Sequence, residues 1–98
     1  MCVGTVRAAR VHDNARAPAL VLNIDFGPRG TRTSSAQLTR RYAPEALVGR
    51  RVVAALGLPP KRVAGVVSTC LVLAAVESEG DAVLLAPDAA VADGTAVR

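Results

Sequence analysis

The sequence predicts an all-β fold, a small closed barrel of five or six short strands. Short apolar runs alternate with turns that contain Gly, Pro, Asn and Asp, which is typical of a small barrel. Hydrophobic residues make up 51% of the chain, but they are mostly Ala, Val and Leu, with one Phe and one Tyr. A core of small and β-branched side chains suits closely packed strands.

The first half of the chain is expected to supply three strands. Residues 3–11 have β character without clean alternation, which predicts a strand that bends or changes faces. Residues 12–18 (HDNARAP) are typical of a loop. Residues 19–26 alternate, with Leu20, Leu22, Ile24 and Phe26 on the buried face. The Gly27-Pro28-Arg29-Gly30 turn then leads into residues 31–38, whose Thr and Ser residues predict an exposed strand.

The second half begins with one helical turn. Pro44 suits an early helical position and Gly49 ends the turn. Residues 51–56 form the next strand, which Pro59 and Pro60 must end because proline lacks a backbone donor. Residues 70–76, apolar throughout, predict a buried strand. Residues 77–81 turn the chain so that residues 82–86 pair back. An oligonucleotide/oligosaccharide-binding (OB) barrel is the usual fold of this size, and an SH3-like barrel is the alternative.

The length and cysteine content indicate one intracellular domain. A chain of 98 residues can bury one core without disulfides, and we expect a single domain over residues 1–98. Cys70 is expected to pack as a small hydrophobe, and Cys2 lies near a terminus, so a reducing, cytoplasmic location fits best. We expect no membrane insertion, because the longest nearly apolar stretch is too short to span a bilayer.

The charge is unevenly placed along the chain. Residues 1–62 hold 11 Lys and Arg against 3 Asp and Glu, whereas residues 63–98 hold 1 against 5. A basic first segment makes a basic face plausible, and nucleic acid is the commonest partner of such faces. The alternative is that Arg serves mainly as a solubilising residue.

Several short motifs resemble those of a known family. They occur in the family's order: Ile24-Asp25-Phe26-Gly27, Ser34-Ser35-Ala36-Gln37-Leu38, Pro59-Pro60-Lys61-Arg62-Val63-Ala64-Gly65, Ser68-Thr69-Cys70-Leu71-Val72-Leu73, Gly80-Asp81 and Asp93-Gly94-Thr95. The sequence therefore resembles the stand-alone tRNA-binding domains, and within them the branch of the export-related chaperone CsaA. The resemblance covers nearly the whole chain. It implies an OB barrel that binds tRNA by shape, unfolded precursor polypeptides, or both.

The resemblance also implies a homodimer. Relatives carry a helix before the first strand that helps to hold the dimer, whereas this sequence begins at Met1-Cys2-Val3-Gly4. We therefore expect the dimer contact to come from residues 1–4 and from the apolar C-terminal residues, including Ala89-Ala90-Val91. Relatives tend to have an acidic residue where this chain has Thr69.

The resemblance and the residue types together suggest a set of tRNA-binding residues. Lys61 and Arg62 follow two prolines and are expected on a rigid, exposed loop, either in contact with phosphate or as a solvated rim. Hydroxyl, amide and guanidinium groups elsewhere suit phosphate, base edges or a peptide backbone, or simply a polar outer face. The full set of expected tRNA-binding residues is Ser34, Ser35, Gln37, Arg40, Arg41, Lys61, Arg62 and Ser68. Arg50 and Arg51 are expected to flank a buried strand.

An apolar groove is expected to bind polypeptide. Its candidate residues are Phe26, Pro59, Pro60 and Leu71. Phe26 has a competing assignment, because a lone Phe on an alternating strand is more often a core residue. With Tyr42 as the only other aromatic residue, stacking on single-stranded bases is disfavoured, and recognition of folded tRNA by shape and phosphates fits better.

The sequence gives little support for catalysis. His12-Asp13 with Ser34 or Ser35 as nucleophile is conceivable, but no nucleophile-elbow motif surrounds either serine. Cys2, His12 and Cys70 lack metal-ligand spacing, and the Gly27–Arg29 turn lacks the lysine of a phosphate-binding loop. We expect a non-enzymatic binding module without metal or cofactor.

Overall fold

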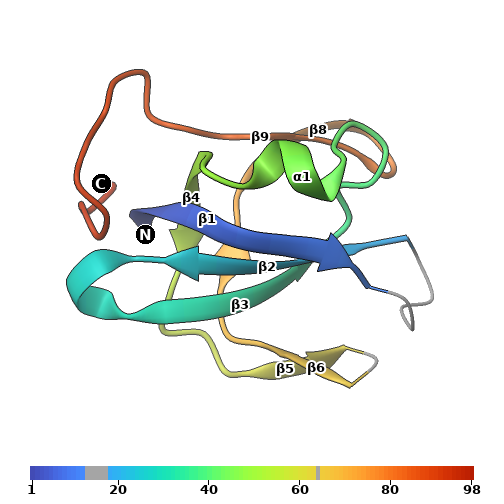
Figure 1. Ribbon diagram of the computed structural model, residues 1–98, viewed down its shortest axis with the longest axis horizontal. Coiled ribbons are helices and arrows are strands. Elements are labelled where there is room, and N and C mark those ends of the chain that lie inside the picture. Colours follow the sequence, from blue (N-terminus) through green and yellow to red (C-terminus); the bar gives the residue numbers. More distant parts are fainter. Residues whose placement is uncertain (13–17, 64) are drawn as a thin grey trace.

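The chain forms a nearly closed antiparallel barrel, here described from a computed structural model (Figure 1). The structure describes residues 1–12, 18–63 and 65–98. Five strands lie in the order β3-β2-β1-β4-β7. Their bounds are β1 Cys2–Val11, β2 Leu20–Asp25, β3 Thr31–Ala36, β4 Arg51–Ala55 and β7 Leu71–Val72. This arrangement is the predicted OB barrel, with extra strands toward the C-terminus.

Among the described residues, two short hairpins and two helical turns accompany the five-stranded sheet. One hairpin pairs β5 (Lys61–Val63) with β6 (Val66–Ser68), and the other pairs β8 (Ala74–Ser78) with β9 (Asp81–Leu84). In Figure 1 the two hairpins lie on opposite sides of the sheet. The 3-10 turn η1 (Gly27–Arg29) joins β2 to β3, and α1 (Pro44–Leu47) precedes β4. Both turns lie where the sequence predicts them. The predicted loop 12–18 falls largely on residues 13–17, outside the described residues.

Strand β1 bends where its alternation fails. Its register with β2 shifts between Val6 and Ala8, which marks a β-bulge. Residues 2–6 before the shift are buried, whereas Arg7, Ala8 and Arg10 after it are exposed. The bulge lets the first part of β1 pair with β4 and the rest follow β2, so the predicted change of face is confirmed.

The core is centred on β2 and the start of β1. Leu20, Leu22, Ile24 and Phe26 are all buried, as their alternation predicts. Gly4 on β1 leaves room for this row, because a Cβ there would lie 2.6 Å from two ring atoms of Phe26. The absence of a side chain at position 4 therefore allows the only Phe of the chain to lie against β1.

The barrel closes between β3 and the chain that follows β6. The Thr69 amide donates to the Thr33 carbonyl at 2.8 Å. Two further bonds of this seam use hydroxyl groups as acceptors: the Thr33 amide donates to Thr69 Oγ1 at 3.3 Å, and the Ser35 amide donates to Ser68 Oγ at 3.4 Å. At this seam, side-chain hydroxyl groups accept hydrogen bonds that backbone carbonyls of a neighbouring strand accept elsewhere in the sheet.

The C-terminal residues extend the sheet beside the start of β1. Pairing between β1 and β2 begins at Thr5 and Asp25, so Cys2 and Val3 lie beyond it. The chain at residues 94–97 takes the vacated place: the Val3 amide donates to the Thr95 carbonyl, and Cys2 bridges Ala96. Figure 1 shows the two termini close together as a result.

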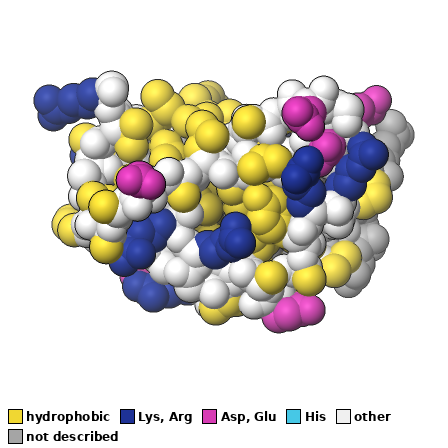
Figure 2. All heavy atoms as spheres, turned by 90° about the horizontal axis from the view of Figure 1, so that it is seen from above, with side chains coloured by type: hydrophobic (Ala, Val, Ile, Leu, Met, Phe, Trp, Pro, Cys, Tyr) yellow, Lys and Arg dark blue, Asp and Glu magenta, His cyan; other side chains and the backbone are white. Residues whose placement is uncertain are grey.

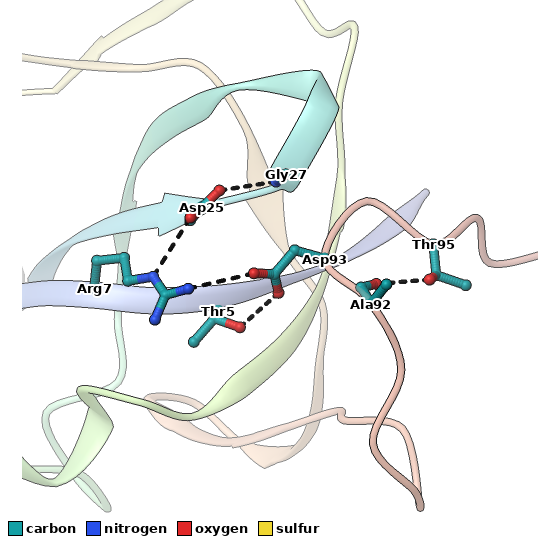
Figure 3. Close-up of polar contacts among 7 residues, drawn as sticks. All are labelled: Thr5, Arg7, Asp25, Gly27, Ala92, Asp93 and Thr95. Atoms are coloured by element: carbon teal, nitrogen blue, oxygen red, sulfur yellow. Dashed lines mark hydrogen bonds and ion pairs between the residues drawn. The ribbon is translucent and has the colours of Figure 1, made fainter.

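A polar network fixes this C-terminal segment (Figure 3). The Thr5 hydroxyl donates to Asp93 at 2.6 Å, and the Arg7 guanidinium lies 3.4 Å from Asp93 and 3.5 Å from Asp25. Asp25 also accepts a bond from the Gly27 amide at 2.8 Å. Arg7 therefore joins β2 to the C-terminal turn, and Asp25 links η1 to the same network.

Three predictions about strands need correction. Residues 70–76 do not form one buried strand: β7 is followed by a break at Leu73, and the side chains of Leu71 and Val76 are 53% and 64% exposed. Uniform apolar character did not reveal that this stretch changes partner from β4 to β9. Lys61 and Arg62 lie on strand β5 and not on a loop. Strand β3 is not wholly exposed, because Ser34 is buried.

Within the described residues, none of the helices has the length and apolar character that crossing a membrane requires.

Candidate functional site

A groove runs along the open side of the barrel, where β3 and the chain after β7 diverge. Three hollows of about 270 to 390 Å³ form it, and neighbouring hollows share Gln37 or Leu71. We call this surface the binding groove. Its lining residues are Pro18, residues 35–40, Leu58, Pro59, Lys61, residues 68–74, Val76, Glu79, Gly80 and Ala82.

The groove has an apolar middle. Residues 71–74, Val76 and Ala82 line one side of it. Leu71 and Val76 are among the most exposed large hydrophobic side chains that the structure describes. Such a contiguous exposed apolar surface is typical of a binding site.

The hairpin β5–β6 supplies a cation at one end of the groove. Lys61 pairs directly with Ser68 across the hairpin, and both line the same hollow with Leu58, Pro59 and Leu71. Consecutive residues of a strand point to opposite faces, so Arg62 points away from the side on which Lys61 lies. The prediction that both cations form one exposed rim is therefore corrected. Arg62 is exposed on the other face, opposite Val67.

Arg40 lies at the other end of the groove, whereas Arg41 forms an ion pair with Asp81. Arg40 donates to the Glu79 carbonyl at 3.2 Å and lines the hollow with Gln37. The ion pair between Arg41 and Asp81 is bidentate: Nε donates to Oδ1, and Nη2 donates to Oδ2 at 3.2 Å. The hydrogen bond between them lowers the pKa of the Asp81 carboxyl and raises that of Arg41. The charge of Arg41 is thus engaged within the protein, unlike a free phosphate-binding cation.

Polar groups on β3 and directly after it line the middle of the groove. Two of the predicted tRNA-binding residues, Ser35 and Gln37, lie there. The Ser35 hydroxyl is 2.8 Å from Nδ1 of His12, which is buried at the end of β1. The contact joins two residues 23 positions apart, the conceivable base and nucleophile of the sequence, whereas Asp13 lies outside the described residues.

Besides Arg41 and Arg62, three predicted site residues do not line the groove: Ser34, Phe26 and Pro60. Ser34 alternates with Ser35 and is 1% exposed, so its hydroxyl cannot meet a ligand directly. Phe26 is fully buried in the core, and the prediction that it lines an open apolar groove is wrong. Pro60 is exposed next to Pro59, but its neighbour is the one that lines the hollow.

Sequence reasoning missed Leu58, Thr69 and Cys70 as lining residues. Cys70 is 5% exposed, and burial raises the pKa of its thiol to about 11, so the neutral thiol dominates at physiological pH. The Ser34 hydroxyl and the charge of Arg32 lower the pKa of this thiol, but burial prevails. Cys70 is therefore an apolar lining residue and not a nucleophile.

An OB barrel whose groove is apolar in the middle and cationic at both ends defines a binding module of the oligonucleotide-binding class. The chain belongs to the family described as "Putative tRNA binding domain", whose profile matches residues 1–96. It is, by family, a tRNA-binding domain.

Known relatives agree with this assignment. The methionine–tRNA ligase of Methanothrix thermoacetophila is 40% identical over 97 residues, and that of Pyrococcus abyssi is 38% identical over 96. These matches cover 98% of this chain but only 14% and 13% of the ligases. The chain is thus similar to one small part of those enzymes.

Solved structures match over their greater part. The crystal structure of chaperone CsaA from Bacillus anthracis superposes with a TM-score of 0.95 at 48% identity, over 99% of this chain and 88% of that one. The CsaA chaperone protein from Picrophilus torridus gives a TM-score of 0.88 at 32% identity, over 98% and 88%. The resemblance to CsaA seen in the sequence is confirmed.

Proposed function

We propose that the binding groove is the tRNA-binding site of a non-catalytic, cytoplasmic module comprising residues 1–98. The observation that carries this proposal is the pairing of Lys61 with Ser68 at the mouth of the groove, with Arg40 at the far end. A cation and a hydroxyl at one point suit a phosphate oxygen, and Ser35 and Gln37 offer further polar contacts along the groove.

Salt dependence tests the proposal, with Arg62 as the matched control. Each neutralised phosphate releases counterions, so affinity for folded tRNA should fall steeply as salt rises. Lys61→Ala should reduce the slope of log affinity against log salt by about one. Arg62→Ala removes the same charge from the neighbouring, opposite-facing position and should change the slope less. Equal affinity and slope for wild type and Lys61→Ala would exclude the groove as the tRNA site.

We propose unfolded precursor polypeptide as a second ligand of the same groove. The exposed side chains of Leu71, Val76 and Leu58 favour it, because apolar contacts serve an unfolded chain better than a phosphate backbone. The structural similarity to proteins named as CsaA chaperones supports this proposal.

A denatured precursor peptide separates this ligand from tRNA. Its binding should depend weakly on salt and should weaken in Leu71→Ser, which removes an exposed apolar side chain without opening the core. Val48→Ser, at an equally exposed position outside the groove, is the control and should leave binding unchanged. Peptide binding that falls with salt as steeply as tRNA binding would argue against an apolar contact.

We further propose that the module is a homodimer. Met1 is 59% exposed and Val91 36% exposed, so the chain ends present apolar surface that a second copy would cover. Light scattering at micromolar concentration should give twice the mass of one chain. A monomer mass with tRNA binding intact would refute the dimer.

A further inference from the structure

A second basic hollow lies apart from the binding groove. It has a volume of about 380 Å³ and is lined by residues 49–51 on one side and residues 86–90 on the other. It shares no lining residue with the three hollows of the groove. Residues 49–51 follow α1, and Figure 2 shows Lys and Arg side chains among apolar surface on the face that carries α1 and the C-terminal segment.

The side chain of Arg50 is held in place by its neighbours. Its guanidinium carbon lies 5.3 Å from the centre of the Tyr42 ring, within cation–π distance. The Tyr42 hydroxyl in turn accepts a bond from the Leu84 amide at 3.1 Å, which fixes the ring against β9. A guanidinium that rests on an aromatic face keeps its in-plane donors available to a ligand.

The backbone at this point is equally fixed. The Gly49 amide donates to the Val6 carbonyl at 2.8 Å, and the Val6 amide donates to the Arg50 carbonyl at 2.9 Å. Arg51 opens β4 in register with Thr5. Little conformational freedom is therefore left to lose on binding, which favours affinity.

The two arginines lack acidic partners among the described residues. Arg7 and Arg41 form ion pairs there, whereas no carboxylate lies within 4 Å of Arg50 or Arg51. Asp88 is the one acidic residue among those that line the hollow, so two cations face one anion. The hollow keeps a net positive charge.

We propose that the hollow formed by Arg50 and Arg51 binds a phosphate group of the tRNA backbone, as a second contact beside the groove. Two arginines that line one hollow suit a phosphate, because a guanidinium group can take its oxygens with paired N–H donors. The proposal rests on tRNA being the ligand of the groove. It adds that one tRNA contacts two faces of the domain.

Glutamine variants test the proposal, because glutamine keeps part of the side-chain stem and removes the charge. Arg51→Gln and Arg50→Gln should each reduce the salt slope of tRNA affinity by about one. Combined with Lys61→Ala, the losses should add, because the two sites share no residue. Arg10→Gln, at an exposed position of β1, is the matched control and should have a smaller effect.

A titration with inorganic phosphate separates backbone phosphate from free phosphate. Arginine side-chain NMR signals of the wild type should shift with tRNA at concentrations where equimolar inorganic phosphate leaves them unchanged. Shifts with inorganic phosphate alone, together with unchanged tRNA affinity in the glutamine variants, would overturn the assignment to tRNA. Loss of dimer mass in these variants would also overturn it, since the arginines would then belong to a contact between copies.

The outcomes distinguish this proposal from that of the groove. If the wild-type protein does not bind tRNA, both proposals are refuted. If tRNA binding responds to Lys61→Ala while Arg50→Gln and Arg51→Gln behave like Arg10→Gln, only the hollow is refuted. Because Arg50 packs on Tyr42, a thermal melt checks that Arg50→Gln is folded. If it is not, the test rests on Arg51→Gln alone.

Discussion

The first 55 residues and the remaining 43 hold their strands in different ways. Strands β1 to β4 are joined by backbone ladders, with one bulge in β1, around buried apolar side chains. After β4 the chain forms two short hairpins and one two-residue strand, joined to β3 partly through hydroxyl groups. Stability therefore comes mainly from the first part, and the second part supplies much of the groove. Much of the binding groove thus belongs to the part of the chain with fewer backbone hydrogen bonds, which packs on the more stable strands β1 to β4.

The largest effect expected from this difference is at Phe26. Phe26→Ala should lower the free energy of unfolding by about 3–5 kcal/mol, because the ring is fully buried in the core. Val76→Ala in the groove should stay within about 0.5 kcal/mol, since its side chain is largely exposed. Urea denaturation measures both. Comparable losses would show that the two regions share one level of packing.

A smaller loss is expected at Gly4, where the core is fullest. Gly4→Ala should destabilise by about 1–3 kcal/mol, because the added Cβ would meet Phe26 and Ile24. Phe26→Leu in the same chain should recover part of this loss by making room. Full additivity of the two changes in a double-mutant cycle would contradict the close approach.

The seam of the barrel should respond by about 1 kcal/mol. Thr69→Val keeps the shape of the side chain but removes the hydroxyl that accepts from the Thr33 amide. Amide hydrogen exchange at Thr33 should speed up, while amides of β2 stay protected. Thr39→Val, at an exposed position, is the control. Unchanged exchange at Thr33 would mean that the hydroxyl does not hold the seam.

The smallest effect at neutral pH concerns Cys70. Its pKa is raised to about 11 in the folded protein, so unfolding at high pH releases a proton that the folded state retains. The stability that the neutral thiol contributes is complete below the ordinary thiol pKa of about 8.5 and is lost as pH rises toward 11. Melting temperatures of wild type and Cys70→Ala between pH 7 and pH 11 measure this. The wild type should lose more over that range, and parallel curves would contradict the shift.

The contrast between the regions also explains what could be predicted from the sequence. Alternation at Leu20, Leu22, Ile24 and Phe26 identified a core strand because one face meets the interior and the other does not. Residues 70–76 offer no such contrast, so the break at Leu73 left no signal. The alternation of apolar residues and the turn-forming residues thus predicted the barrel, whereas the change of partner strand depends on tertiary contacts.

The site residues, too, could be predicted from the sequence only in part. Ser35, Gln37, Lys61, Ser68, Pro59, Leu71 and Arg40 were predicted and do line the groove. Two of the predicted residues that do not line the groove are neighbours of residues that do: Ser34 beside Ser35, and Arg62 beside Lys61. Residue type indicated which segments carry the site, but only strand register decides which of two adjacent side chains reaches it. Arg50 and Arg51 could not be found, because their hollow is completed by residues 86–90.

The pairing of the two chain ends has a consequence for how this domain can be built into longer proteins. The Val97 amide donates to the Met1 carbonyl at 2.8 Å, so a polypeptide that enters at residue 1 leaves from almost the same point. Two flanking segments would emerge side by side, and the domain could be inserted into a surface loop of a host without forcing that loop apart. The same geometry allows a short linker to join residue 98 to residue 1, with new ends opened at the exposed Gly57.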